Sequence, residues 1–217
     1  MNGSVRNIPS PEEALESAYL AERTRILSLS QAENACDGDF SHPVFGEGDA
    51  HARVMLVGEA PGGEEAASGR PFVGKAGKQL AALLAAVDIA RDTVYITNAV
   101  KYRPVTRSAR SVRNRTPSKA EVLASLPLLK REIETVRPAV IVTLGNTPLS
   151  AVRLLSESGG EKPAVIGALH GAAHPLHIAG RSVALFPLYH PASGIYNRAL
   201  VAVMEADMQA LSDYLSK

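Results

Sequence analysis

The chain has 217 residues, 46% of them hydrophobic and 21% charged, with a formal net charge of +1. These values are typical of a single globular domain over residues 1–217 and leave too little chain for two. The charge total neither indicates nor excludes a nucleic-acid partner, because local charge binds phosphate. Its one cysteine, Cys36, excludes an intrachain disulfide, and we see neither a membrane-spanning run nor a secretory signal. We therefore expect a cytoplasmic protein without membrane contact.

Predicted helices and strands alternate along the chain. Ser10 can cap a helix that begins with proline and two acids, which predicts an N-terminal helix at about 10–34. A loop rich in Gly, Asp and Pro is expected over residues 37–49. Short apolar runs then predict buried strands at 54–57, 94–97, 139–144 and 183–186, and helical patterns separate or follow them at 77–87, 117–136, 147–155 and 200–214. This alternation favours an α/β sandwich with a mostly parallel sheet.

Polar residues stand where the predicted strands end. Glu59 follows Gly58, Asn98 follows the second run, Asn146 the third, and His190 the fourth. In open α/β sheets, ligands bind outside the carboxyl ends of the strands. The sequence therefore predicts a functional site at this edge of the sheet.

Six glycines lie between Gly58 and Gly77, and they permit tight turns and close approach of the backbone to a ligand. The stretch lacks the Gly-Lys-Ser/Thr ending of a nucleotide P-loop and the spacing of a dinucleotide fingerprint. From the residues alone, it is either a structural strand-to-helix loop or a ligand-binding loop.

Three segments resemble signatures of the uracil-DNA glycosylase superfamily, most closely its family 4. The stretch from Gly58 to Gly77 is similar to the first signature, and Tyr189-His190-Pro191-Ala192-Ser193-Gly194 is similar to the second. Between them, residues 96–104 resemble the strand end that reads uracil. The similarity runs from about Val44 to the C-terminus. It implies a three-layer α/β/α sandwich with a central four-stranded parallel sheet.

The resemblance also implies residue roles. Phe72 matches the platform on which uracil stacks, and Asn98 matches the amide that reads uracil N3–H and O4. His190 matches the histidine that binds uracil O2 and stabilises charge on the departing base. Gly58 and Ala60 match backbone positions that border the base. A core phenylalanine at 72 and an asparagine that merely ends a strand are the structural alternatives.

The residue that activates water is left open by the sequence. The best-known branch of the superfamily has an aspartate where this chain has Ala60. Glu59 and Glu65 are the carboxylates that remain to orient water, and Glu65 is alternatively a wall that excludes thymine. The resemblance places Ser193, Ile195 and Tyr196 in a loop that enters the minor groove, with Ile195 as an apolar wedge.

The chain departs from family 4 in its cysteines. Members of that family hold an iron–sulfur cluster on four cysteines, whereas this chain has only Cys36. Tyr102 and Ser125 stand at positions that resemble later ligands. We therefore predict no cluster, no other metal and no cofactor.

A second departure is the stretch 103–119, which carries six basic residues and no acid. We expect a flexible loop in which Arg107, Arg110, Arg113 and Arg115 bind the DNA backbone and hold the abasic product. A solvated surface loop is the alternative.

These observations predict a monomeric, monofunctional glycosylase that hydrolyses the N-glycosidic bond of uracil in single- or double-stranded DNA and leaves an abasic site for base excision repair. Two alternatives remain. The enzyme could act on another deaminated base, such as hypoxanthine, or the chain could bind uracil-containing or abasic DNA without catalysis.

Overall fold

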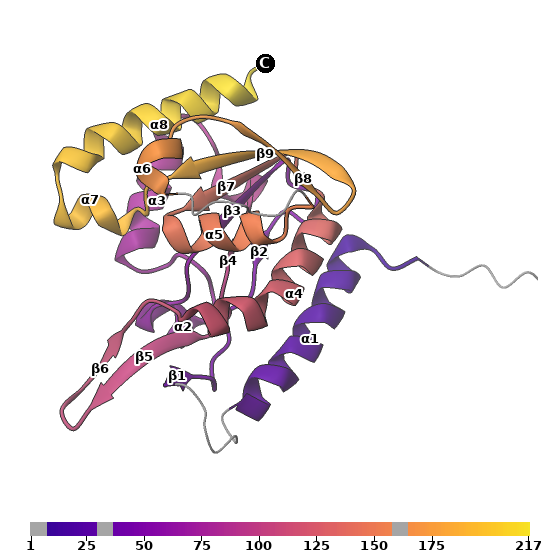
Figure 1. Ribbon diagram of the computed structural model, residues 1–217, viewed down its shortest axis with the longest axis vertical. Helices are drawn as coiled ribbons and strands as arrows, with labels where there is room; N and C mark the ends of the chain where they lie inside the picture. The colour runs from indigo at the N-terminus through magenta and orange to yellow at the C-terminus, as the bar shows by residue number, and fades with distance from the viewer. Residues whose placement is uncertain (1–7, 30–36, 158–164) are drawn as a thin grey trace, which may run out of the picture.

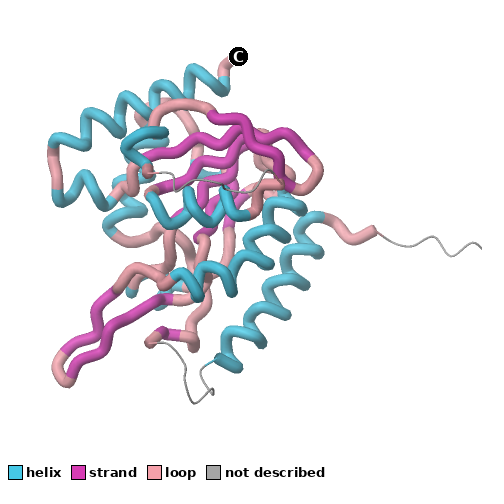
Figure 2. Tube along the Cα trace, viewed as in Figure 1, coloured by secondary structure: helices cyan, strands magenta, loops and turns pink. Residues whose placement is uncertain are grey.

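A computed structural model describes residues 8–29, 37–157 and 165–217 of the chain. Its centre is a six-stranded sheet with helices on both faces (Figures 1 and 2). In the order β2-β4-β3-β7-β9-β8, the strands are Glu47–Gly48, Tyr95–Asn98, Val54–Gly58, Val140–Leu144, Arg181–Leu188 and His174–Ile178.

The four central strands β4, β3, β7 and β9 run parallel, as predicted, while both edge strands run antiparallel to their neighbours. The register pairs Gly58 with Asn98 and Leu144 with Leu188, so that all four parallel strands end at one edge. The edge strands β2 and β8 are additions to the predicted sheet, and β2 lies in the stretch expected to be a loop.

Both faces of the sheet are covered, which explains why the central strands are continuous apolar runs. Met55 and Val57 of β3 belong to a buried cluster on one face, while Val54 and Leu56 belong to a second cluster on the other. The first cluster includes residues of α1 (Pro11–Leu29), α4 (Lys119–Val136) and α5 (Asn146–Leu154). The second includes residues of α3 (Lys75–Ala85) and α8 (Ala199–Leu215). The three-layer α/β/α arrangement is therefore confirmed.

The predicted helices are present with small shifts of their bounds. They are α1 (Pro11–Leu29), α3 (Lys75–Ala85), α4 (Lys119–Val136), α5 (Asn146–Leu154) and α8 (Ala199–Leu215). Shorter helical segments are α2 (Gly63–Ser68), η1 (Arg91–Thr93), α6 (Ile166–Leu169) and α7 (Ala192–Tyr196). The predicted continuation of α1 to residue 34 lies outside the described residues. Within the described ranges, none of the helices is long and apolar enough to cross a membrane.

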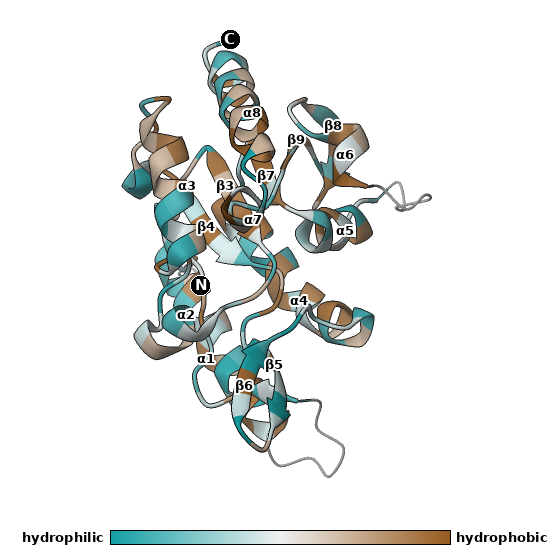
Figure 3. Ribbon diagram, turned by 90° about the vertical axis from the view of Figure 1, so that its left-hand side faces the viewer, coloured by the Kyte–Doolittle hydropathy of each residue, from teal (hydrophilic) through white to brown (hydrophobic). Residues whose placement is uncertain are grey.

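The basic stretch after β4 is an ordered β-hairpin, so the predicted flexible loop is wrong. Strands β5 (Arg103–Ser108) and β6 (Ser111–Asn114) pair antiparallel, and β1 (Gly38–Asp39) adds a third strand beside β5. Buried Val105 anchors the base, and the Ser108 hydroxyl accepts a hydrogen bond from the Ser111 amide across the turn at 3.1 Å. The largely hydrophilic hairpin projects from the body of the molecule (Figures 1 and 3).

Residues 193–196 also differ from the prediction. They belong to the one-turn helix α7, between β9 and α8, where a loop was expected. Buried Gly194 explains the tight packing of this turn, because a Cβ there would lie 2.4 Å from the Met204 methyl group of α8.

Candidate active site

The ends of the parallel strands meet at one edge of the sheet and build the floor of the site. The Ala99 amide donates to the Gly58 carbonyl at 2.8 Å, which joins the ends of β4 and β3. The Gly145 amide donates to the Leu188 carbonyl at 2.8 Å and joins the ends of β7 and β9. The carboxyl ends of the parallel strands therefore lie side by side, as the prediction of a site at this edge requires.

Gly58 is the point where two predicted uracil-binding side chains converge. A Cβ built on Gly58 would lie 2.3 Å from Oδ1 of Asn98 and 2.5 Å from Cζ of Phe72. Both distances are far below van der Waals contact, so only glycine fits. The amide of Asn98 and the ring of Phe72 therefore lie against the same backbone position, although 26 residues separate them.

The loop that carries Phe72 is held in an unusual conformation. Phe72 has φ of +53°, in the left-handed region that costs a non-glycine residue energy. The buried carboxylate of Glu65 accepts hydrogen bonds from the amides of Gly62, Val73 and Gly74 at 3.1, 3.1 and 2.8 Å. Gly77 completes the turn, because a Cβ there would lie 1.9 Å from the Phe72 carbonyl oxygen.

This geometry gives Glu65 a task that the sequence did not predict. Its oxygens accept hydrogen bonds from the backbone on both sides of Phe72, so the side chain holds the loop that carries this predicted platform. Both of its oxygens already accept hydrogen bonds from backbone amides, so they are not free to hold a water molecule in the cavity. We therefore withdraw the expectation that Glu65 orients water.

His190 lies beside Phe72 with one ring nitrogen already engaged. The two ring centroids are 6.3 Å apart with an interplanar angle of 34°. The Ala192 amide donates to Nδ1 of His190 at 3.2 Å. Burial lowers the pKa of His190 below 6.5, against the opposing charges of Glu59 and Glu65. The imidazole is therefore neutral at pH 7, and the hydrogen bond at Nδ1 assigns its proton to Nε2.

Glu59, the other carboxylate predicted to orient water, is held by two hydrogen bonds. It follows β3 directly, and its Oε2 accepts a hydrogen bond from the Thr147 hydroxyl of α5 at 2.6 Å. Its backbone carbonyl accepts from the Val100 amide at 3.1 Å. Both contacts fix Glu59 relative to the parallel strands. The sequence did not single out Thr147, because a threonine in the first turn of a helix is usually read as part of its cap.

A cavity of about 400 Å³ unites these residues, which is within the range of small-molecule sites. The cavity is lined by Phe72, Asn98, His190, Glu59, Glu65 and Ala60. The predicted Gly58 does not line it but lies against Asn98 and Phe72. Exposed Asn114, at the end of β6, borders the cavity as well, and its Oδ1 accepts from Nε of Arg103 at 2.6 Å. Sequence reasoning missed Asn114 because its chain position gave no sign that the hairpin returns to the pocket.

The predicted wedge residues lie on the surface of α7, a few residues beyond His190. Ile195 is 47% exposed and Tyr196 is 89% exposed. Ser193 is half-buried, and its carbonyl accepts from the Asn197 amide at 2.9 Å. Ile195 and Tyr196 are therefore available to a partner.

The hairpin arginines do not form one surface. Arg107 is opposite Val112 and Arg113 is opposite Thr106, so the two arginines project from opposite faces of the hairpin. Both are exposed, as is Arg110 in the turn. Arg107 also donates to the Gly38 carbonyl at 3.3 Å.

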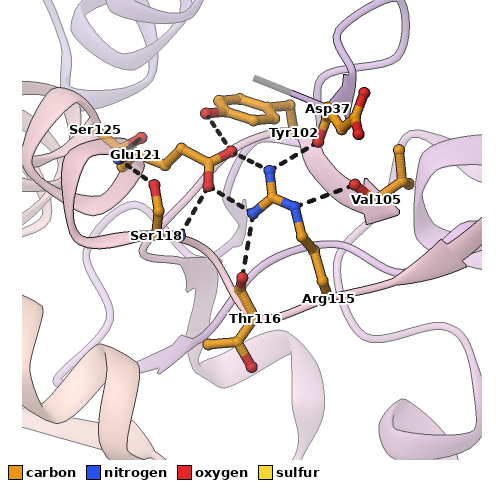
Figure 4. Close-up of polar contacts among 8 residues, drawn as sticks. All are labelled: Asp37, Tyr102, Val105, Arg115, Thr116, Ser118, Glu121 and Ser125. Carbon is orange, nitrogen blue, oxygen red and sulfur yellow. Dashed lines mark hydrogen bonds and ion pairs between the residues drawn. The ribbon is translucent and has the colours of Figure 1, made fainter. Parts of the chain in front are cut away.

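Arg115 differs from the other hairpin arginines. We no longer expect it to contact DNA phosphate, because its guanidinium is already bound within the protein. Its guanidinium pairs with both oxygens of Glu121 at 2.7 and 2.9 Å and donates to three backbone carbonyls (Figure 4). These five contacts engage the guanidinium within the protein, although Arg115 also lines the cavity.

A buried ion pair beneath Asn98 was also missed. Nζ of Lys101 donates to Oε2 of Glu132 at 2.6 Å and to the Asn98 carbonyl at 2.5 Å, and both charged side chains are fully buried. Burial lowers the pKa of Lys101, against the raising effect of Glu132. The Tyr19 hydroxyl joins the network at Glu132 and pairs with the Tyr95 hydroxyl. The sequence offered one signal of this ion pair, which is the position of Lys101 in the apolar segment that follows β4.

An aromatic ring, a side-chain amide and a neutral imidazole line one cavity, and these groups suit a planar heterocyclic base. Residues 45–212 match the family model described as the uracil DNA glycosylase superfamily, and the chain belongs to this superfamily.

Several relatives are type-4 uracil-DNA glycosylases. The protein of Saccharolobus solfataricus is 40% identical over 174 residues, covering 80% of this chain and 76% of that protein. The protein of Sulfurisphaera tokodaii is 36% identical over 174 residues, covering 80% and 74%. The protein of Pyrobaculum aerophilum is 39% identical over 165 residues, covering 76% and 79%.

Proposed function

We propose that this chain is a monofunctional uracil-DNA glycosylase, which hydrolyses the bond between uracil and deoxyribose and leaves an abasic site for base excision repair. The observation that carries the proposal is the convergence of Phe72, Asn98 and His190 on one cavity at the carboxyl edge of the sheet. The names of the type-4 relatives support the same activity.

Recognition begins with the base outside the helical stack, because its reactive bond is inaccessible in a duplex. Phe72 stacks on the flipped uracil, close to the backbone of Gly58 and Ala60. The Asn98 amide accepts a hydrogen bond from uracil N3–H and donates one to O4. Cytosine presents the reverse pattern, so an amide held in one orientation leaves its polar groups unpaired and rejects it.

His190 acts on the departing base. Cleavage of the N-glycosidic bond moves negative charge into the uracil ring and onto O2. The Nε2–H of neutral His190 donates to that oxygen and stabilises the charge as it develops, as an oxyanion hole does. The Ala192 amide at Nδ1 fixes the donor tautomer before the substrate arrives.

Glu59 orients the attacking water. Its carboxylate, held by the Thr147 hydroxyl, accepts a hydrogen bond from water and directs the water oxygen to C1′ of the sugar. The water oxygen forms the new bond to C1′, the electron pair of the glycosidic bond leaves with uracil, and the released proton passes to the anionic base. Glu65 contributes by framing the loop of Phe72.

The DNA is held outside the cavity by two surface elements. Ile195 enters the stack beside the vacated position, with Tyr196 next to it and Ser193 at the backbone. Arg107, Arg110 and Arg113 of the hairpin bind phosphates, and their charge also retains the abasic product. We propose that the protein works as a monomer in the cytoplasm on uracil in single- or double-stranded DNA.

A second candidate function is binding of uracil-containing or abasic DNA without catalysis. Ala60 favours it, because this cavity residue offers no carboxylate where the superfamily's best-known branch has an aspartate. The adjacent Glu59 favours the enzyme.

The test is excision from matched oligonucleotides that contain one uracil, cytosine, thymine or hypoxanthine. We expect free uracil from the first DNA alone. Release of hypoxanthine at a similar rate would reassign the substrate, and release of no base would leave the binding function.

A further inference from the structure

A dense polar network lies at the base of the hairpin, beside the cavity (Figure 4). At its centre, Nη1 and Nη2 of Arg115 donate to Oε2 and Oε1 of Glu121 at 2.7 and 2.9 Å. The Glu121 side chain is 4% exposed and that of Arg115 is 25% exposed. The geometry is the bidentate fork that only arginine can make with a carboxylate.

The network joins segments that are far apart in the chain. Nη2 of Arg115 donates to the Asp37 carbonyl at 2.8 Å, and Nε donates to the Val105 carbonyl of β5 at 3.1 Å. Glu121 lies in the first turn of α4, where the Ser118 amide donates to its Oε2 at 2.7 Å. One guanidinium therefore connects the segment before β1, the hairpin and α4.

The network includes two residues whose sequence positions resemble those of family 4 cluster ligands. Tyr102 and Ser125 stand at positions that resemble cluster ligands, and both contact Glu121. The Tyr102 hydroxyl donates to Oε1 at 3.2 Å, and the Ser125 hydroxyl donates to the Glu121 carbonyl at 2.9 Å. Cys36 precedes Asp37 in the chain but lies outside the described residues.

These donors do not fit an iron–sulfur cluster. Such a cluster needs several thiolate ligands, and the whole chain contains one cysteine. Among the described residues, no group of three or more His, Cys, Asp or Glu side chains could hold a metal ion. A phenol, a hydroxyl and a guanidinium–carboxylate pair stand at this place instead.

We propose that the Arg115–Glu121 pair is a positioning device for the active site that works without a cluster. It fastens the segment before β1 and the hairpin to α4. Arg115 directly follows Asn114, which borders the cavity, so the pair also sets where the hairpin meets the bound DNA. The effect on excision rests on the proposed glycosylase function, whereas the fastening does not.

The experiment compares Arg115→Gln, Arg115→Lys, Glu121→Gln and the double Gln variant with wild type. The matched control is Lys130→Gln and Glu134→Gln, an exposed ion pair on the same helix at 3.7 Å. Removing one partner of a largely buried pair should lower Tm by roughly 10 °C, and the double variant should lose little more than either single. The control variants should change Tm by about 1 °C or less.

Activity is measured at a temperature where circular dichroism shows every variant folded. The DNA concentration for half-maximal single-turnover excision should rise roughly 10-fold in Arg115→Gln, an order-of-magnitude estimate for a displaced binding element. The saturated rate should change less than about threefold, because Phe72, Asn98, His190 and Glu59 are intact. Arg115→Lys should resemble Arg115→Gln, because an ammonium cannot make the fork. The salt slope of DNA affinity should stay unchanged.

Other results would overturn the proposal. If Arg115→Gln keeps the wild-type Tm but lowers the salt slope by about 0.9, Arg115 is a phosphate ligand. If Arg115→Lys keeps the wild-type Tm and DNA affinity, the bidentate hydrogen bonds are not needed and the proposed fastening fails. Iron in the purified protein, with absorbance near about 400 nm, would show that the cluster is retained. If wild type releases no uracil, the glycosylase function fails, while the Tm comparison still decides the fastening.

Discussion

Replacement of His190 by alanine tests the chemistry of the pocket most sharply. The structure assigns His190 a neutral ring whose Nδ1 accepts from the Ala192 amide, which leaves Nε2–H as the donor. Loss of one such preorganised donor costs about 2.7–4 kcal/mol of transition-state stabilisation. We therefore expect single-turnover excision of uracil to slow by roughly 10²- to 10³-fold, with little change in DNA affinity.

The assay is a single-turnover time course with enzyme in excess over DNA, for wild type, His190→Ala and the control His51→Ala. His51 lies on the surface, with its side chain 68% exposed, and should tolerate the change. A loss of less than about threefold in His190→Ala would refute the donor role.

The pH dependence follows from the same geometry. Because burial lowers the pKa of His190, the ring should remain neutral as pH falls below 6.5. An NMR titration of the ring nitrogens should show the proton on Nε2 at pH 7. Titration of His190 at or above its ordinary pKa would contradict the assignment of a neutral donor.

Further changes test separate parts of the account. Replacing Asn98 by leucine leaves uracil N3–H and O4 unpaired, so kcat/KM for uracil should fall roughly 100-fold; an unchanged preference over cytosine would remove Asn98 from base reading. Glu59→Gln should slow excision by roughly 10²-fold or more without lowering Tm. Glu65→Gln should lower Tm, because it weakens the hydrogen bonds to Gly62, Val73 and Gly74. The opposite pattern would mean that Glu65, and not Glu59, orients the water. Lys101→Met leaves Glu132 buried without its cation and should cost about 3–5 kcal/mol in the free energy of unfolding, measured by urea denaturation; a cost below about 1 kcal/mol would mean that the pair is solvated. Neutralising Arg107, Arg110 and Arg113 together should reduce the salt slope of DNA affinity by about 0.9 for each phosphate that these side chains neutralise in the wild-type complex, and an unchanged slope would exclude the hairpin as a phosphate-binding element.

The central sheet was predictable because its signal is local. Strands buried on both faces must be continuous apolar runs, and β3 and β7 are short segments of this kind that end at a glycine or leucine. Their carboxyl ends must share one edge of a parallel sheet. The convergence of Glu59, Asn98 and His190 therefore followed from strand order, and the resemblance added Phe72.

The hairpin and its fastening were not predictable because they depend on distant partners. A run of arginines and serines has the composition of a solvated loop, and only the pairing with β1 and the burial of Val105 make it a sheet. The sequence does not distinguish Arg115 from the exposed arginines of the hairpin. Only its contacts with Asp37 and Glu121 in the fold show that its role is different. Likewise, only the fold shows that Lys101 is buried against Glu132.

Release of free uracil over many turnovers tests the central claim most directly. Duplex and single-stranded DNA with one uracil are incubated in about tenfold excess over the protein, and free base and alkali-labile abasic sites are quantified together. We predict that uracil and abasic sites accumulate in equal amounts beyond one equivalent of protein, with the DNA backbone intact before alkali. Bound DNA that retains its uracil, with no free base above background, would contradict the account and leave a binding protein.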